Sequence, residues 1–99
     1  MKHSIEHIGA ALQKARIEKG LSQRALGDSI GMPQSHISKI ESGLVDLKTS
    51  TLIELSRILD LEPMLIPRML VRTVYALEQK GKANEQRPMY RLNEEEDEE

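Results

Sequence analysis

Two short amphipathic segments, separated by one glycine and a Met-Pro pair, restrict this chain more than any other feature of its sequence. The first segment, residues 23–30, follows Ser22, a good helix N-cap, and ends at Gly31, which tolerates positive φ. The second, residues 34–41, follows Pro33, and proline is tolerated where a helix begins. The sequence therefore predicts two short helices joined by a tight turn.

Apolar residues on both sides of this pair recur every three or four positions, as one buried helix face requires. They predict a preceding helix over residues 5–19, capped by Ser4 and ended by Gly20, and a following helix capped by Thr49 or Ser50. The inward residues that we expect in the four helices are Ile5, Ile8, Leu12, Ala15, Ala25, Leu26, Ile30, Ile37, Ile40, Leu52, Ile53, Leu55, Ile58 and Leu59.

A proline-bracketed segment, residues 63–67, follows the fourth helix and cannot extend it smoothly. Met64, Leu65 and Ile66 predict a short strand there. Because a lone strand leaves backbone groups unpaired, we expect this strand to pair with its copy in a second subunit. Residues 68–80 then predict a fifth helix that covers the same interface, with the apolar residues Met69, Leu70, Val74 and Leu77.

Composition limits the fold class and the compartment. The 99 residues suit one compact domain with modest extensions. There is no Cys, which excludes disulfides and thiolate-bound zinc, and no apolar run approaches the roughly 20 residues that span a bilayer. Two Tyr are the only aromatic residues. We therefore expect a cytoplasmic, all-α chain of four to five helices with one short strand, no membrane association, and a core of aliphatic residues.

The formal charge of −2 conceals a division along the chain. Residues 94–99 are all acidic, whereas residues 1–93 hold 14 Lys and Arg against 10 Asp and Glu. The body is thus mildly basic and carries an acidic tail. The division that we expect is a helical domain over residues 4–61, a strand and helix for dimerisation over residues 62–80, and a disordered acidic tail over residues 81–99.

The pair of short helices has the pattern of a helix-turn-helix. Matching positions are Gly20-Leu21-Ser22-Gln23, Ala25, Gly31, and the run from Ile37 to Gly43, Ile-Ser-Lys-Ile-Glu-Ser-Gly. Through them, residues 8–60 resemble the phage-repressor and Cro-like (Xre) helix-turn-helix family. The resemblance implies a repressor-like DNA-binding domain whose second short helix enters the major groove.

The outward face of that second helix supports the same interpretation. The major groove, about 12 Å wide, admits one helix, which must project polar groups while its apolar side anchors it. With Ile37 and Ile40 inward, the outward residues that we expect at base edges are Gln34, Ser35, His36 and Lys39. In the family, positions matching Gln34, Ser35 and Lys39 touch bases. Contact by His36 is left open, because surface imidazoles are common.

Other residues are expected to hold the protein on the DNA backbone. Gln23 begins a helix, whose N-terminus carries partial positive charge, and the family match assigns it a phosphate contact. Arg24 and Ser42 are further candidates for phosphate contact. The resemblance also implies a structural ion pair between Arg16 and Glu41.

Residues 48–67 resemble the corresponding part of HipB-type antitoxins, in which a helix runs into a short strand that pairs across a dimer. This implies a homodimer that binds an inverted-repeat operator in double-stranded DNA, represses its own operon and neutralises a HipA-like serine/threonine kinase toxin. Two alternatives stay open. One is a stand-alone phage or restriction-modification regulator, and the other is a protein-interaction module that does not bind DNA.

Motifs for catalysis or metal binding do not occur. The sequence has no Cys nucleophile, no glycine-rich phosphate loop and no His-Glu-x-x-His pattern. His3 and His7 lie four residues apart without a third ligand nearby. We therefore expect no enzymatic activity, no cofactor and no metal.

Overall fold

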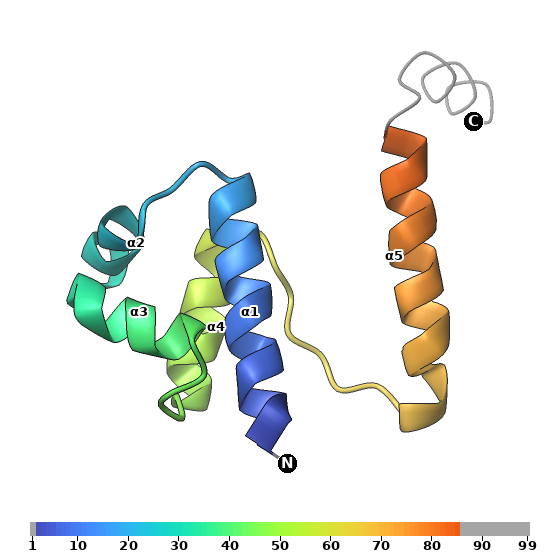
Figure 1. Ribbon diagram of the computed structural model, residues 1–99, viewed down its shortest axis with the longest axis horizontal. Coiled ribbons are helices and arrows are strands. Elements are labelled where there is room, and N and C mark those ends of the chain that lie inside the picture. The colour runs from blue at the N-terminus through green and yellow to red at the C-terminus, as the bar shows by residue number, and fades with distance from the viewer. Residues whose placement is uncertain (1, 86–99) are drawn as a thin grey trace. The chain divides into compact units, whose positions relative to one another are not determined.

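The computed structural model describes residues 2–85, with side chains over residues 5–81 (Figure 1). Its helices are α1 (Lys2–Glu18), α2 (Gln23–Ile30), α3 (Gln34–Glu41), α4 (Thr49–Ile58), the 3-10 turn η1 (Arg68–Leu70) and α5 (Val71–Glu85). No residue within the described range lies in a strand. The predicted all-α fold class is confirmed within this range. The chain divides into two units, one ending at Met64 and the other beginning at Leu65.

In the first unit α3 packs against both α1 and α2, and α2 also packs against α4 (Figure 1). Each of these helices contributes apolar residues to one core, and Leu26 and Ile37, at 1% exposed, occupy its centre. The fully buried core residues are Leu12, Leu26, Ile37, Ile40, Leu55 and Leu59. Burial of this shared apolar face, at roughly 25 cal/mol per Å², holds short helices that would be marginal alone.

The ends of α2 follow the local signals in the sequence. The Ser22 side chain accepts a hydrogen bond from the Ala25 amide at 2.9 Å, which satisfies one of the amides that lack an intrahelical partner. Gly31 ends α2 in the left-handed region at φ 70°, and the Met32 amide donates to Gly27 O at 2.9 Å. This C-terminal arrangement turns the chain directly into α3.

Two helix starts differ from the sequence-based prediction. Helix α1 begins at Lys2, so Ser4 lies inside the helix instead of capping it. Residues 2–4 include no Pro or Gly that would stop the helix. Helix α4 begins at Thr49, and Lys48 occupies its N-cap in an extended conformation without a side-chain cap hydrogen bond. A capping side chain is favourable at a helix start but is not required.

Two further predictions were wrong in the second half of the chain. Ile53 of α4 is 38% exposed, because the core takes up only one side of this helix, the side that carries Leu55 and Leu59. Gly81 lies inside α5 instead of ending a helix at Lys80. The helix-forming neighbours of Gly81 outweigh its cost of about 1 kcal/mol.

The segment between α4 and η1 contains neither helix nor strand in this chain. Leu65 in this segment is fully exposed and Met64 is 72% exposed, whereas Ile66 is half-buried. The expected strand at residues 63–67 needs a second copy for its pairing, and it stays a prediction. The expected acidic tail lies, from residue 86 onward, outside the described residues.

Candidate nucleic-acid interface

Helices α2 and α3 approach each other closely because position 27 is a glycine. A Cβ atom at Gly27 would overlap the carbonyl oxygen of Met32 and would lie 3.3 Å from Ile37 Cγ1. The buried glycine therefore lets the turn fold back against α2. Ile37 and Ile40, at 1% and 2% exposed, attach α3 to the core from its inner side.

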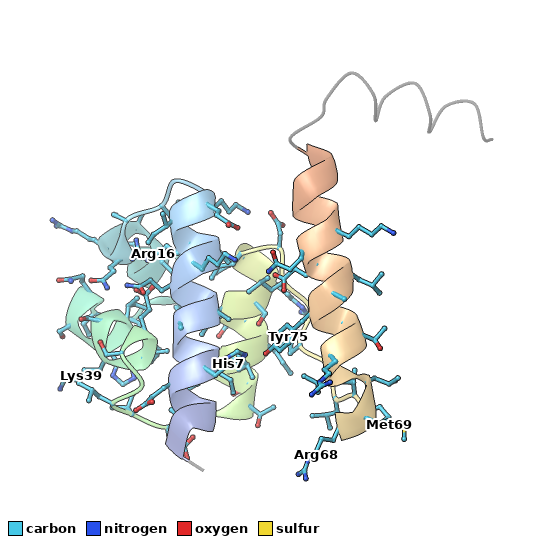
Figure 2. All side chains as sticks on the ribbon, turned by 45° about the vertical axis from the view of Figure 1, so that its right-hand side comes forward. His7, Arg16, Lys39, Arg68, Met69 and Tyr75 are labelled. Carbon is cyan, nitrogen blue, oxygen red and sulfur yellow. The ribbon has the colours of Figure 1, made fainter. Side chains whose placement is uncertain are left out.

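The outer side of α3 is polar. Gln34, Ser35 and Lys39 are exposed, and Lys39 projects away from the helices (Figure 2). His36 is half-buried and only partly matches the outward position expected for it. Pro33 at the N-cap provides no side-chain hydrogen bond. The helix thus presents an amide, a hydroxyl and an ammonium group on a rigidly anchored face.

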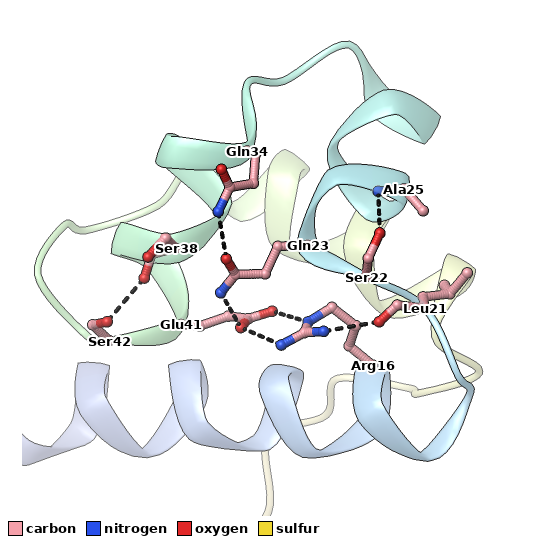
Figure 3. Close-up of polar contacts among 9 residues, drawn as sticks. All are labelled: Arg16, Leu21, Ser22, Gln23, Ala25, Gln34, Ser38, Glu41 and Ser42. Carbon is pink, nitrogen blue, oxygen red and sulfur yellow. Dashed lines mark hydrogen bonds and ion pairs between the residues drawn. The ribbon is translucent and has the colours of Figure 1, made fainter.

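A chain of hydrogen bonds runs from this exposed face into the protein (Figure 3). Gln34 Nε2 donates to Gln23 Oε1 at 2.7 Å. Gln23 Nε2 in turn donates to Glu41 Oε1 at 3.0 Å. Both ends of the Gln23 amide are therefore engaged, and the side chain of Gln34 is held at the start of α3 by α2.

The series of hydrogen bonds ends inside the protein at the Arg16–Glu41 ion pair. Arg16 Nε donates to Glu41 Oε2 at 2.7 Å and Nη2 donates to Oε1 at 3.1 Å. Arg16 Nη1 also donates to the carbonyl oxygen of Leu21 at 2.8 Å. The residues are 8% and 6% exposed, so the bidentate pair joins α1, the loop before α2 and the end of α3 in a low-dielectric setting.

The sequence did not indicate that Gln23 would bridge Gln34 and Glu41, nor that the Leu21 carbonyl would complete the Arg16 site. The Leu21 partner is a backbone carbonyl, which every residue type carries, so the sequence does not mark it. The contact between the glutamines could have been suggested by their positions, because each is the first residue of a short helix. In the described side chains, no buried polar atom lacks a hydrogen-bond partner.

The two other residues expected at phosphates differ in their surroundings. Arg24 is exposed near the start of α2, and no ion pair involves it in the described part of the chain. The Ser42 hydroxyl donates to the Ser38 carbonyl at 2.9 Å. Its single proton is therefore already used within α3, and a phosphate contact by this hydroxyl would have to replace that bond.

The described residues form neither a metal site nor a membrane span. No group of three or more His, Asp or Glu side chains in the described range is placed to hold a metal ion. None of the helices described is long and apolar enough to cross a membrane.

Comparison with known proteins places this arrangement in a family. The helix-turn-helix family model HTH_3 matches residues 12–66. An uncharacterised HTH-type transcriptional regulator, y4dL of Sinorhizobium fredii, is 39% identical over 74 residues, which is 75% of this chain. The chain spans only 38% of the length of that regulator.

A solved structure shares the fold. The restriction-modification controller protein C.AhdI from Aeromonas hydrophila superposes with a TM-score of 0.58 at 29% identity, covering 63% of this chain and 90% of that protein. More than half of the chain matches the family model, and the turn, the buried face of α3 and the α1–α3 ion pair lie within the match. The chain belongs to the helix-turn-helix family.

Proposed function

We propose that this protein is a sequence-specific DNA-binding transcription regulator that places α3 in the major groove. The observation that carries the proposal is the two-sided character of α3. Its inner side is fixed by Ile37 and Ile40, and its outer side presents Gln34, Ser35 and Lys39 to solvent. A helix with such a face is what the major groove accepts.

Gln34 is the residue that we assign to base recognition first. Its Nε2 is engaged with Gln23 at 2.7 Å, which leaves the carbonyl oxygen and the second amide hydrogen for a base edge. A Gln amide pairs well with the N6 and N7 atoms of adenine. Because Gln23 holds the amide in place, less side-chain entropy is lost on binding. The neighbouring base pairs would be contacted by Ser35 and Lys39, and by His36 at the margin of the face.

Contacts to the phosphate backbone would position this helix. Gln23 and Arg24 begin α2, whose N-terminal amides favour an anion. Ser42, at the other end of α3, is a weaker candidate because its hydroxyl proton is already bound. These contacts supply affinity and orientation without reading sequence.

We further propose that the regulator acts as a homodimer and represses transcription. Met64, Leu65 and Ile66, two of them strongly exposed, would pair with their copies, and α5 would cover the joint. Two recognition helices would then meet half-sites about 34 Å apart, in an inverted repeat.

Two biological settings fit such a dimer. The likeness to a restriction-modification controller favours a stand-alone regulator. The sequence resemblance to HipB-type antitoxins over residues 48–67 favours a regulator that also binds a HipA-like kinase. The DNA-binding face is the same in both settings. They are distinguished by whether the purified dimer binds such a kinase with a defined stoichiometry.

The test is fluorescence anisotropy with DNA from upstream of its own gene and with scrambled DNA of equal length, each over a salt series. Tight, selective binding that weakens steeply with salt is expected, because phosphate contacts release counterions. A matched probe with only one half-site should bind more weakly. Equal binding to both sequences, or binding insensitive to salt, would contradict the proposal and favour a protein-interaction module.

A further inference from the structure

Residues 65–93 carry a surplus of positive charge that residues 1–64 lack, and the six acidic residues 94–99 follow them. Residues 1–64 contain eight Lys and Arg and eight Asp and Glu, so the helix-turn-helix unit has no formal surplus. Residues 65–93 contain six basic residues and two acidic ones. Neutralisation of phosphates by Lys and Arg supplies much of the affinity of DNA-binding proteins. The surplus positive charge that could neutralise phosphates therefore follows the helix-turn-helix in the sequence.

Part of the positive charge in the first unit is also neutralised internally. Arg16 is bound to Glu41 at 2.7 Å, and Lys19 Nζ lies 2.9 Å from Asp60 Oδ2. These two cations are engaged in holding α1 to α3 and to the end of α4. The first unit thus has even fewer cations to offer to a phosphate backbone than its composition indicates.

Two arginines at the start of the second unit are exposed and four residues apart. Arg68 lies in η1 and Arg72 in the first turn of α5, and no ion pair involves either in the described part of the chain. Figure 2 shows Arg68 and Met69 leaving the helix start in different directions. Four residues of helix separate the arginines by about 6 Å of rise, which is close to the distance between adjacent phosphates of one DNA strand.

The apolar residues of α5 leave this basic side free. Leu70, Val74 and Leu77 follow at intervals of four and three, so they form one stripe along the helix. Arg72, two residues after Leu70, lies on the opposite side of the helix from that stripe. A protein contact through the stripe would therefore leave Arg68 and Arg72 exposed to solvent.

We propose that Arg68 and Arg72 form a second DNA contact, on the phosphate backbone beside the site that α3 occupies. The inference rests on the proposed function, because it requires the first unit to be on DNA. Residues 61–67, which lead from the end of α4 to η1, span at most about 25 Å when fully extended. The arginines consequently stay close to any DNA that the first unit binds, where their effective concentration is high.

The test compares the full-length protein with the double variant Arg68→Gln/Arg72→Gln on operator DNA over a salt series. The plot of log K against log salt concentration should become shallower by about two units per protomer, with the ranking of mutated operators unchanged. The charge-retaining variant Arg68→Lys/Arg72→Lys should keep the slope of the wild-type protein. Arg57→Gln, at an exposed position of α4, is the control for loss of one charge elsewhere.

Sedimentation velocity and circular dichroism would verify that the double variant keeps its association state and helix content. An unchanged slope, with wild-type protein still bound selectively, would overturn this inference and leave the proposed function intact. Failure of the wild-type protein to select the operator would instead overturn the proposed function. The double variant could instead bind DNA more tightly than the wild-type protein, and deletion of residues 94–99 could have the same effect. This result would show that the arginines bind the acidic segment, and it would contradict the DNA contact.

Discussion

Gln34 at the start of α3 donates its side-chain amide to Gln23 at the start of α2, with 2.7 Å between Nε2 and Oε1. The same Gln23 amide donates to Glu41 at the far end of α3. One side chain of α2 therefore contacts both ends of the proposed recognition helix. The base reading proposed for Gln34 and the positioning proposed for Gln23 are for this reason physically linked.

Gln34→Ala should weaken binding to the specific operator by about 1–3 kcal/mol and relax preference at one base pair. Gln23→Ala should weaken binding to all sequences more evenly, because it removes the phosphate contact proposed for Gln23. The measurement is anisotropy on a panel of single-base operator variants. Because the residues touch, the double variant should lose less than the sum of the single losses. Equal losses by Gln34→Ala on operator and random DNA would exclude Gln34 from base reading.

Breaking the Arg16–Glu41 pair should destabilise the first unit by about 3–5 kcal/mol, since one removed partner leaves a buried charge. The variant is Arg16→Met and the measurement is urea unfolding. Arg16→Met/Glu41→Leu should recover part of the loss. The control is Lys19→Met, at the exposed Lys19–Asp60 pair, for which about 0–1 kcal/mol is expected. Similar losses of unfolding free energy in Arg16→Met and Lys19→Met would show that burial does not determine how much an ion pair contributes to stability.

Ile37→Ala should cost about 2–5 kcal/mol in unfolding free energy, because the side chain is 1% exposed in the core. The matched control is Ile17→Ala in α1, where the side chain is 60% exposed. Both changes replace Ile by Ala in a helix and so gain the same helix propensity. The difference between their losses of unfolding free energy therefore reports the effect of burial. We expect Ile17→Ala to stay within about 0.5 kcal/mol of wild type.

Gly9→Ala should destabilise the packing of α1 on α3, whereas Gly81→Ala should increase the helix content of α5. A Cβ atom at Gly9 would overlap the carbonyl oxygen of Ile40 and lie 2.8 Å from that of Glu41, whereas one at Gly81 meets nothing within 4 Å. At Gly81 only the helix propensity changes, by about 1 kcal/mol in favour of alanine. Thermal unfolding and far-UV circular dichroism would measure both, and a stabilising Gly9→Ala would contradict the close approach.

Leu65→Asp should abolish self-association while leaving the fold of the first unit unchanged, if the segment around Leu65 pairs between two copies. Leu65 is fully exposed, so the charge adds no strain within one chain. Sedimentation equilibrium would measure the association constant. Ile17→Asp, at another exposed apolar residue, should leave this constant unchanged. A Leu65→Asp variant that still associates as wild type would remove this segment from the interface.

Local signals in the sequence determined the helix-turn-helix itself. Ser22, Gly31 and Pro33 act through their own backbone and near neighbours, and the bounds predicted for α2 and α3 are those that the structure has. The apolar spacing likewise identified Ile37 and Ile40 as inward residues. Each of these features depends on groups within a few positions of one another, which a sequence displays directly.

Tertiary structure alone decided how those helices are coupled and how far each apolar face is buried. The bonds from Gln23 to Glu41 and from Arg16 to Glu41 join residues 18 and 25 positions apart, so they exist only after α1, α2 and α3 pack. Ile53 has the same apolar character as Leu55 but is exposed, because the core of the first unit takes up the side of α4 that carries Leu55 and Leu59. A periodic pattern specifies which residues share a face, whereas packing against other elements decides whether that face is covered.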